Sequence, residues 1–114
     1  MKQVMKEQNL ELYKLKARLC KTFSDPKRLI ILDFLRHGEK SVGEIVETLN
    51  INQAVVSRQL AILRDRGIVA PRRDGTNIYY SLTDTRICDA CDVVHEILLN
   101  QIEKNKEMAE RLMG

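Results

Sequence analysis

A short run of polar side chains within residues 52–67 has the residue types that bind the edges of nucleic-acid bases. Gln53 and Arg58 carry a carboxamide and a guanidinium, which make paired hydrogen bonds to adenine and to guanine. Ser57 adds a hydroxyl on the same segment, and Ala54 is small enough to contact a thymine methyl group. These residues form a candidate surface for reading double-stranded DNA.

An amphipathic helix is expected to carry this surface. Val56, Leu60 and Leu63 recur at intervals of four and three residues, which makes one apolar stripe and leaves the polar residues to face elsewhere. Asn52 is a suitable N-cap for this helix, and Gly67 is a suitable stop.

A second, shorter helix is predicted just before it. Ser41 and Glu44 form a capping-box motif ahead of an apolar pattern that runs to Leu49, and residues 50–52 leave room for only a tight turn. Two short helices joined this closely are typical of a helix-turn-helix, here residues 41–67. An ordinary corner between two helices in a helical protein has the same pattern.

A β-hairpin is predicted after the helix pair. Residues 68–70 and 77–82 are rich in β-branched and aromatic side chains, and Asp74-Gly75 between them is a hairpin signal. A helix-turn-helix followed by a hairpin is a winged helix, with residues 68–82 as the wing. Between Gln53 and Arg73, five arginines stand against one acid, Asp65, which is the charge pattern of a phosphate-facing surface: Arg58, Arg64, Arg66, Arg72 and Arg73.

Several further polar residues have candidate roles at the DNA or at the helix ends. Gln59 is assigned to a phosphate or a base, and Arg66, near the helix end, to capping carbonyls. Lys27 and Arg28 open another helix and either meet a phosphate or form an exposed first turn. The phosphate or minor-groove candidates on the helix and the wing are Arg64, Arg72, Arg73 and Thr76.

Three more helices are predicted to flank the winged helix. The first covers residues 5–22. The second begins after Asp25 and runs to about His37, with Leu29, Ile30, Leu32, Phe34 and Leu35 expected to be largely buried. The last covers residues 84–112 and has a coiled-coil-like stripe that needs another helix against it: Ile87, Cys91, Val94, Leu98 and Ile102.

Composition limits the class of protein. The chain has 114 residues, 44% hydrophobic and 31% charged, which fits one domain over residues 1–114 with no stretch of membrane-spanning length. The charged N-terminal segment is unlike a signal peptide, and three cysteines are an odd number for a disulfide framework, so we expect a cytoplasmic protein with reduced thiols. The sequence has only two histidines and no Gly-rich phosphate loop, and we find no set of residues typical of a catalytic site. An enzyme is therefore not expected.

The chain resembles the ArsR/SmtB family of winged-helix repressors from residue 23 to residue 82. The resemblance is carried by FSDPKRLIILDFL, SVGEIVETLNINQAVVSRQLAILRDRGIV and RRDGTNIYYSL, which occur together and in order. It implies a mainly α winged helix-turn-helix with the order α-α-α-α-β-β-α, a homodimer through the first and last helices, and repression of transcription. Two recognition helices on such a dimer would read an inverted-repeat operator, with the helices about 34–36 Å apart. A winged helix used for protein contact is the alternative, but its outer face would be apolar.

The resemblance also implies an effector, and the cysteines are the candidates for its site. Cys88, Cys91 and His95 share one face of the last helix, and Cys20 lies on the first. Three sulfurs would suit arsenite, antimonite or cadmium as inducer, and two sulfurs with the histidine would suit zinc. A redox or reactive-sulfur switch and simple packing of the cysteines in the helix seam remain open as alternatives.

Overall fold

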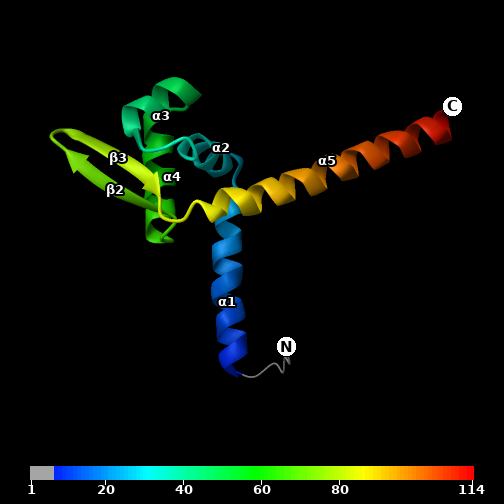
Figure 1. The fold of residues 1–114 in the computed structure, drawn as a ribbon, viewed down its shortest axis with the longest axis horizontal. Coiled ribbons are helices and arrows are strands. Elements are labelled where there is room, and N and C mark those ends of the chain that lie inside the picture. Colours follow the sequence, from blue (N-terminus) through cyan, green and yellow to red (C-terminus); the bar gives the residue numbers. More distant parts are fainter. Residues whose placement is uncertain (1–6) are drawn as a thin grey trace. The chain divides into compact units, whose positions relative to one another are not determined.

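The computed structural model describes residues 7–114, which divide into two units, one ending at Thr83 and one from Asp84 to Gly114 (Figure 1). Residues 5 and 6, where the first helix is predicted to begin, lie outside the described residues. The fold is mainly helical with a small antiparallel sheet, which confirms the predicted class. In chain order the elements are α1 (Glu7–Lys21), the 3-10 helix η1 (Thr22–Ser24), α2 (Pro26–Leu35), β1 (Lys40–Ser41), α3 (Val42–Leu49), α4 (Gln53–Asp65), β2 (Val69–Asp74), β3 (Asn77–Leu82) and α5 (Arg86–Met113).

The start of α2 is fixed by a side-chain cap. The Asp25 carboxylate accepts hydrogen bonds from the backbone amides of Lys27, at 2.8 Å, and Arg28, at 3.3 Å. These amides have no partner within the helix, so the cap satisfies donors that would otherwise depend on water. The helix ends at Leu35, short of the predicted end at His37.

The helix pair α3 and α4 is also defined by its caps. Ser41 Oγ accepts from the Glu44 amide at 3.1 Å, and the Glu44 carboxylate accepts from the Ser41 amide at 2.9 Å, which completes the capping box. The turn between the helices passes through Asn50 in the left-handed region, at φ 53°, a conformation that asparagine tolerates well. Asn52 then caps α4 by accepting from the Ala54 amide at 2.8 Å.

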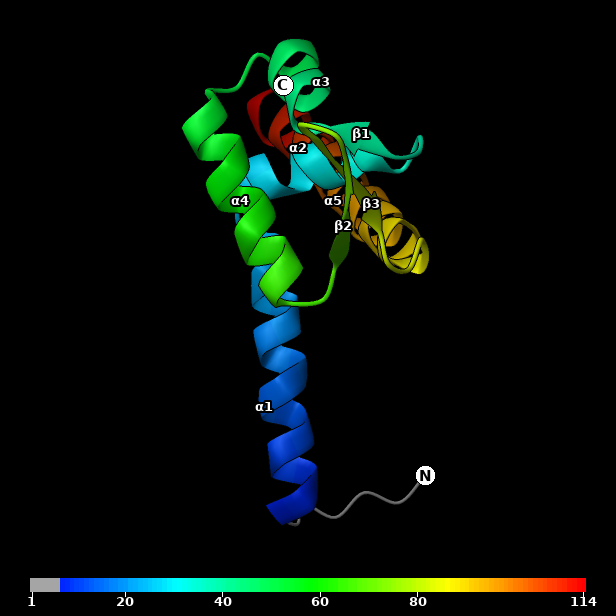
Figure 2. The same cartoon turned by 90° about the vertical axis from the view of Figure 1, so that its left-hand side faces the viewer.

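The sheet has three strands in the order β1-β3-β2, all antiparallel (Figure 2). β2 and β3 form the wing, with Arg72 opposite Tyr79, and the chain turns between them at Gly75, whose φ is 65°. β1 adds a third strand on the other side of β3, with Lys40 opposite Tyr80. The sequence did not predict β1, because a strand of two residues is too short to show alternation.

The core of the first unit lies between α2, α3, α4 and the base of the sheet. Only one side of α2 takes part in it, so Leu29 and Ile30 are 38% and 47% exposed in the single chain. The expectation that both would be largely buried was therefore wrong for the chain by itself. The apolar side chains that are buried in this unit are Ile31, Leu32, Leu35, Ile45, Val56, Leu60, Leu63, Ile68, Val69 and Tyr80.

The second unit is the single long helix α5, which has 28 residues. Asp84 precedes it and accepts from the Arg86 amide at 2.9 Å. The helix exposes many apolar side chains along its length, including Val94, Leu98 and Ile102. Among the described residues, no helix has both the length and the apolar character to span a membrane.

Candidate nucleic-acid interface

α4 has one buried face and one exposed face. Val56, Leu60 and Leu63 are fully buried, so the apolar stripe of the sequence is the side that packs against the rest of the unit. The residues on the other side are solvent-exposed, and we call them the outer face of α4: Gln53, Ala54, Ser57, Arg58 and Arg64. The base-reading side chains predicted from the sequence therefore lie where a ligand can reach them.

A groove lies beside the outer face, between α3, the start of α4 and the wing. Its volume is about 350 Å³. Polar side chains of α4 and the wing, such as Ser57 and Thr76, line it together with an apolar floor. The lining residues are Val42, Gly43, Val46, Gln53, Ser57, Thr76, Asn77 and Ile78. Asn77 was missed as a site candidate, because its place at the start of a strand carries no chemical signal in the sequence.

The wing arginine Arg72 is held in a defined position. Its guanidinium donates to both oxygens of Glu39, at 2.8 Å each, and stacks over the Tyr79 ring at 4.8 Å. The hydrogen bond from Arg72 lowers the pKa of Glu39, and the same contact raises the pKa of Arg72. Arg73 and Thr76 are exposed on the same hairpin. Sequence reasoning missed Glu39 and Tyr79: strand pairing places Tyr79 opposite Arg72, and Glu39, just before β1, reaches Arg72 only through the tertiary fold.

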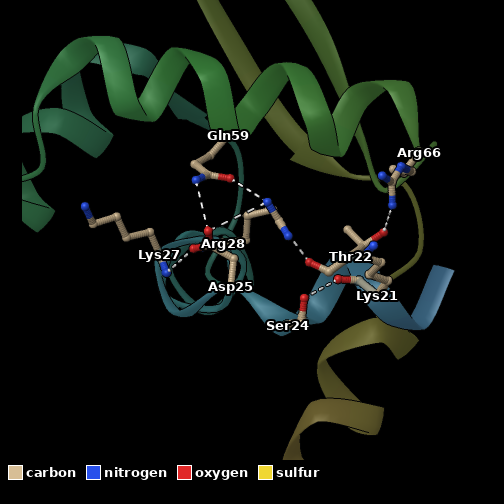
Figure 3. Close-up of polar contacts among 8 residues, drawn as sticks. All are labelled: Lys21, Thr22, Ser24, Asp25, Lys27, Arg28, Gln59 and Arg66. Atoms are coloured by element: carbon tan, nitrogen blue, oxygen red, sulfur yellow. Dashed lines mark hydrogen bonds and ion pairs between the residues drawn. The ribbon is translucent and has the colours of Figure 1, made fainter. Parts of the chain in front are cut away.

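Gln59 is not part of the outer face. It is 4% exposed, and both ends of its amide are used inside the unit (Figure 3). Its Oε1 accepts from Arg28 Nη1 at 2.9 Å, and its Nε2 donates to Asp25 Oδ2 at 3.3 Å. The expectation that Gln59 contacts DNA is therefore wrong for the single chain. The residue lies three positions after Val56 and one before Leu60, which puts it on the buried side of α4.

Arg28 and Arg66 belong to the same internal arrangement. The Arg28 side chain is only 13% exposed, and its Nε donates to the Thr22 carbonyl at 2.7 Å, so it does not face outward as a phosphate contact would. Arg66 Nη1 donates to Thr22 Oγ1 at 2.9 Å and to the Arg18 carbonyl at 3.0 Å. The Arg66 side chain thus binds a carbonyl of α1, and the end of α4 is capped by the Arg66 backbone amide. Lys27 remains exposed, and its side chain points away from this cluster (Figure 3).

The effector candidates lie on two helices. Cys20 is exposed on α1, whereas Cys88 is buried and Cys91 half-buried on α5, where His95 follows one turn later. Within residues 7–114, no group of three or more His, Cys, Asp and Glu side chains is arranged to hold a metal ion. Cys88 and Cys91 lie three residues apart on α5. The three-sulfur set expected from the sequence adds Cys20 from the first helix across a dimer, and it stays a prediction.

Known proteins are similar to this chain in sequence and fold. A family model described as bacterial regulatory protein, arsR family, matches residues 25–70. The biofilm growth-associated repressor of Xylella fastidiosa is 39% identical over 85 residues, which are 75% of each chain. A probable mercury resistance operon repressor of Streptomyces lividans is 42% identical over 73 residues, 64% of this chain and 58% of that one. The solution structure of the homodimeric winged helix-turn-helix DNA-binding domain of Mb0332 from Mycobacterium bovis is 30% identical, has a TM-score of 0.74, and covers 85% of this chain and 93% of that one. These relatives are regulators and not enzymes.

Proposed function

This chain belongs to the ArsR family of bacterial regulatory proteins, and from that premise we propose that it is a DNA-binding transcriptional repressor acting in the cytoplasm. The observation that carries the proposal is the exposed outer face of α4, which presents Gln53, Ser57 and Arg58 beside the groove under the wing. Repression, and not activation, is supported by relatives that are named as repressors.

The proposed recognition helix is α4, lying in the major groove. Arg58 is suited to guanine and Gln53 to adenine, with Ser57 and Ala54 completing the contact near the start of the helix. Arg64, near the helix end, is suited to a phosphate. A winged helix built for protein contact would have an apolar outer face, whereas every long side chain on this one is polar or charged.

The proposed role of the wing is to bind the DNA backbone. Arg72 and Arg73 supply positive charge on the hairpin, and Thr76 supplies a hydroxyl at its tip. Cations near phosphates release counterions, which makes binding strongly dependent on salt. Backbone contacts of this kind fix the register of α4 without reading sequence.

We infer that the protein binds as a homodimer to an inverted repeat. The exposed apolar side chains of α1 and α5 need a partner, and the Mb0332 domain is described as homodimeric. A two-fold dimer places two copies of α4 in equivalent positions, so its natural target has two-fold symmetry, with half-site centres about 34–36 Å apart.

The test is binding to a duplex selected from a random library, with affinity measured by fluorescence anisotropy over a range of salt concentrations. Arg58→Ala is expected to reduce the difference in binding free energy between the selected and an unrelated duplex by about 1–3 kcal/mol. Arg58→Ala together with Arg72→Ala is expected to flatten the salt dependence as well. Lys104→Ala, on the polar side of α5, is the matched control. The proposal fails if the double variant binds with the affinity and salt dependence of the unmodified protein.

We further propose that a thiol-reactive inducer releases the DNA. Cys88 and Cys91 are three residues apart on α5 and share a helix face, and soft metal ions and metalloids prefer thiolate ligands. The relative named for a mercury resistance operon supports an inducer of this class. A redox or reactive-sulfur switch at the same cysteines is the alternative, because thiolates also react with oxidants.

Titration of the DNA complex separates these inducers. Arsenite, antimonite, cadmium, zinc and inorganic polysulfide are added in turn to the reduced protein on its duplex, and DNA release is followed by anisotropy. The agent that releases DNA is expected to lose its effect on Cys88→Ser. Cys20→Ser and His95→Ala report whether α1 or the histidine takes part. If no agent releases DNA, the inducer proposal is wrong while the DNA-binding proposal stands.

A further inference from the structure

A partly buried polar network, in which Thr22 and Gln59 are buried, joins α4 to the junction between α1 and α2 (Figure 3). Gln59 binds Arg28 and Asp25 at the start of α2, and Arg28 continues the network to the Thr22 carbonyl in η1. Near the end of α4, Arg66 reaches the Thr22 hydroxyl. The network is defined by these five residues: Thr22, Asp25, Arg28, Gln59 and Arg66.

The network can fix α4 in a way that the apolar core cannot. Apolar contacts are not directional, so they permit a helix to turn slightly about its axis at little cost. Hydrogen bonds are directional, and an unpaired buried polar group is costly, so a satisfied buried network favours one arrangement. The Gln59 amide uses its oxygen and its nitrogen on two different partners, which fixes the rotation of α4 at that position.

Gln59 follows directly after the residues proposed to read bases. Successive side chains of an α-helix are about 100° apart around its axis, so Gln59 faces inward while Arg58 and Ser57 face outward. A rotation of α4 that broke the Gln59 hydrogen bonds would move both of these side chains relative to the groove of the DNA. Base contacts depend on placement to within about 0.5 Å, whereas phosphate contacts through long, flexible side chains are more tolerant.

We propose that Gln59 is a positioning residue that sets the sequence specificity of α4 without touching DNA. This inference rests on the proposed DNA-binding function. Asp25 and Arg28 hold the Gln59 amide, and Arg66 holds the other end of the helix. The network also joins the recognition helix to α1, whose exposed apolar side chains are proposed to contact a second copy of the chain.

The first test uses Gln59→Met, which keeps the length of the side chain and removes both hydrogen bonds. Asp25 and Arg28 stay within reach of each other, at 3.9 Å, so the variant is expected to fold. The measured quantity is the ratio of affinities for the selected and an unrelated duplex, with concentrations corrected for the folded fraction from circular dichroism. The ratio is expected to fall about tenfold, the effect of one mismatched base pair, while affinity for the unrelated duplex is unchanged. A residue that only stabilises the fold would leave the corrected ratio unchanged.

The second test separates an internal role of Arg28 from a phosphate contact. Arg28→Gln is expected to keep the slope of log affinity against log salt, whereas loss of a phosphate contact reduces that slope by about 0.9. Arg73→Gln, at an exposed wing position, is the matched control and is expected to show that reduction. The positioning role is overturned if Arg28→Gln loses slope as Arg73→Gln does, or if Gln59→Met keeps the ratio. If the unmodified protein binds no duplex at all, the proposed function itself is wrong.

Discussion

Arg72 illustrates how a single wing residue can serve two purposes. Its contacts with Glu39 and Tyr79 hold the guanidinium in place before any ligand arrives, which lowers the entropy cost of binding. The same Glu39 is ionised at neutral pH and cancels the positive charge of Arg72, and the hydrogen bond from Arg72 lowers its pKa further from neutrality. While the pair persists, Arg72 and Glu39 together are therefore expected to add little net charge for phosphate binding, and loss of Arg72 alone would leave the Glu39 charge uncompensated beside the DNA backbone.

Removal of the Glu39 charge tests this balance. Glu39→Gln is expected to leave Arg72 with an uncancelled charge, so the slope of log affinity against log salt becomes steeper by about 0.9. The slope is measured with an unrelated duplex, where phosphate contacts dominate. Glu47→Gln, an exposed position on α3, removes the same charge elsewhere and serves as the control. Equal slopes for Glu39→Gln and the unmodified protein would mean that Arg72 already leaves Glu39 when DNA binds.

Residue types were a good guide to the outer face of α4 and a poor guide to Gln59. Ser57 and Arg58 are polar, lie off the apolar stripe, and are exposed as predicted. Gln59 is equally polar, but it lies on the same buried side of α4 as Val56 and Leu60. The hydrogen-bond partners that make its burial possible come from the start of a different helix, α2. The position of Gln59 within the apolar pattern can be read from the sequence, but its tertiary contact with Arg28 cannot.

At the level of elements, the start of α5 contains a carboxylate whose pKa is lowered by its neighbours. The side-chain hydrogen bonds from Arg86, together with its backbone amide, lower the pKa of Asp84 to about 2. A carboxylate whose pKa is lower in the folded state stabilises the fold when ionised. That contribution is fully present above the ordinary aspartate pKa, near 3.8, and is lost as the pH falls toward 2.

Asp84→Asn is expected to remove this acid dependence. Asparagine can still accept a hydrogen bond from the Arg86 amide but does not titrate, so the variant should lose less stability than the unmodified protein between pH 4 and pH 2, the interval set by the two Asp84 pKa values. The free energy of unfolding is measured by urea denaturation, followed by circular dichroism, at a series of pH values. Identical pH profiles for the two proteins would show that the Arg86 contact contributes nothing to stability.

The elements with caps and periodic patterns could be predicted, and those defined by tertiary contacts could not. The capping box at Ser41 and the cap at Asp25 depend on neighbouring residues only, so both were visible in the sequence. β1 exists because β3 lies beside it, and two residues carry no pattern of their own. For Leu29 and Ile30 the sequence predicted burial and the single chain exposes them, because an apolar helix sequence does not show which side faces the core.

On the scale of the whole molecule, the single chain exposes many apolar side chains on both α1 and α5. The exposed side chains of α1 include Leu12 and Leu15, and those of α5 include Val94, Leu98 and Ile102. Exposed apolar patches of this kind mark protein interfaces. On α5 the spacing of four and three residues is that of a helix seam, which a second helix can fill.

A charge placed in the seam is expected to separate the dimer. Leu98→Lys puts an ammonium at the centre of the proposed interface, where burying it without a partner is costly, so the protein should sediment as a monomer in analytical ultracentrifugation. Asn100→Lys adds the same charge on the opposite side of α5 and should remain dimeric. Because a monomer has one copy of α4, Leu98→Lys should bind a full inverted repeat no more tightly than a single half-site. A dimeric Leu98→Lys protein would place the interface elsewhere, and a monomer that still prefers the full repeat would show that the two half-sites need no contact through α5.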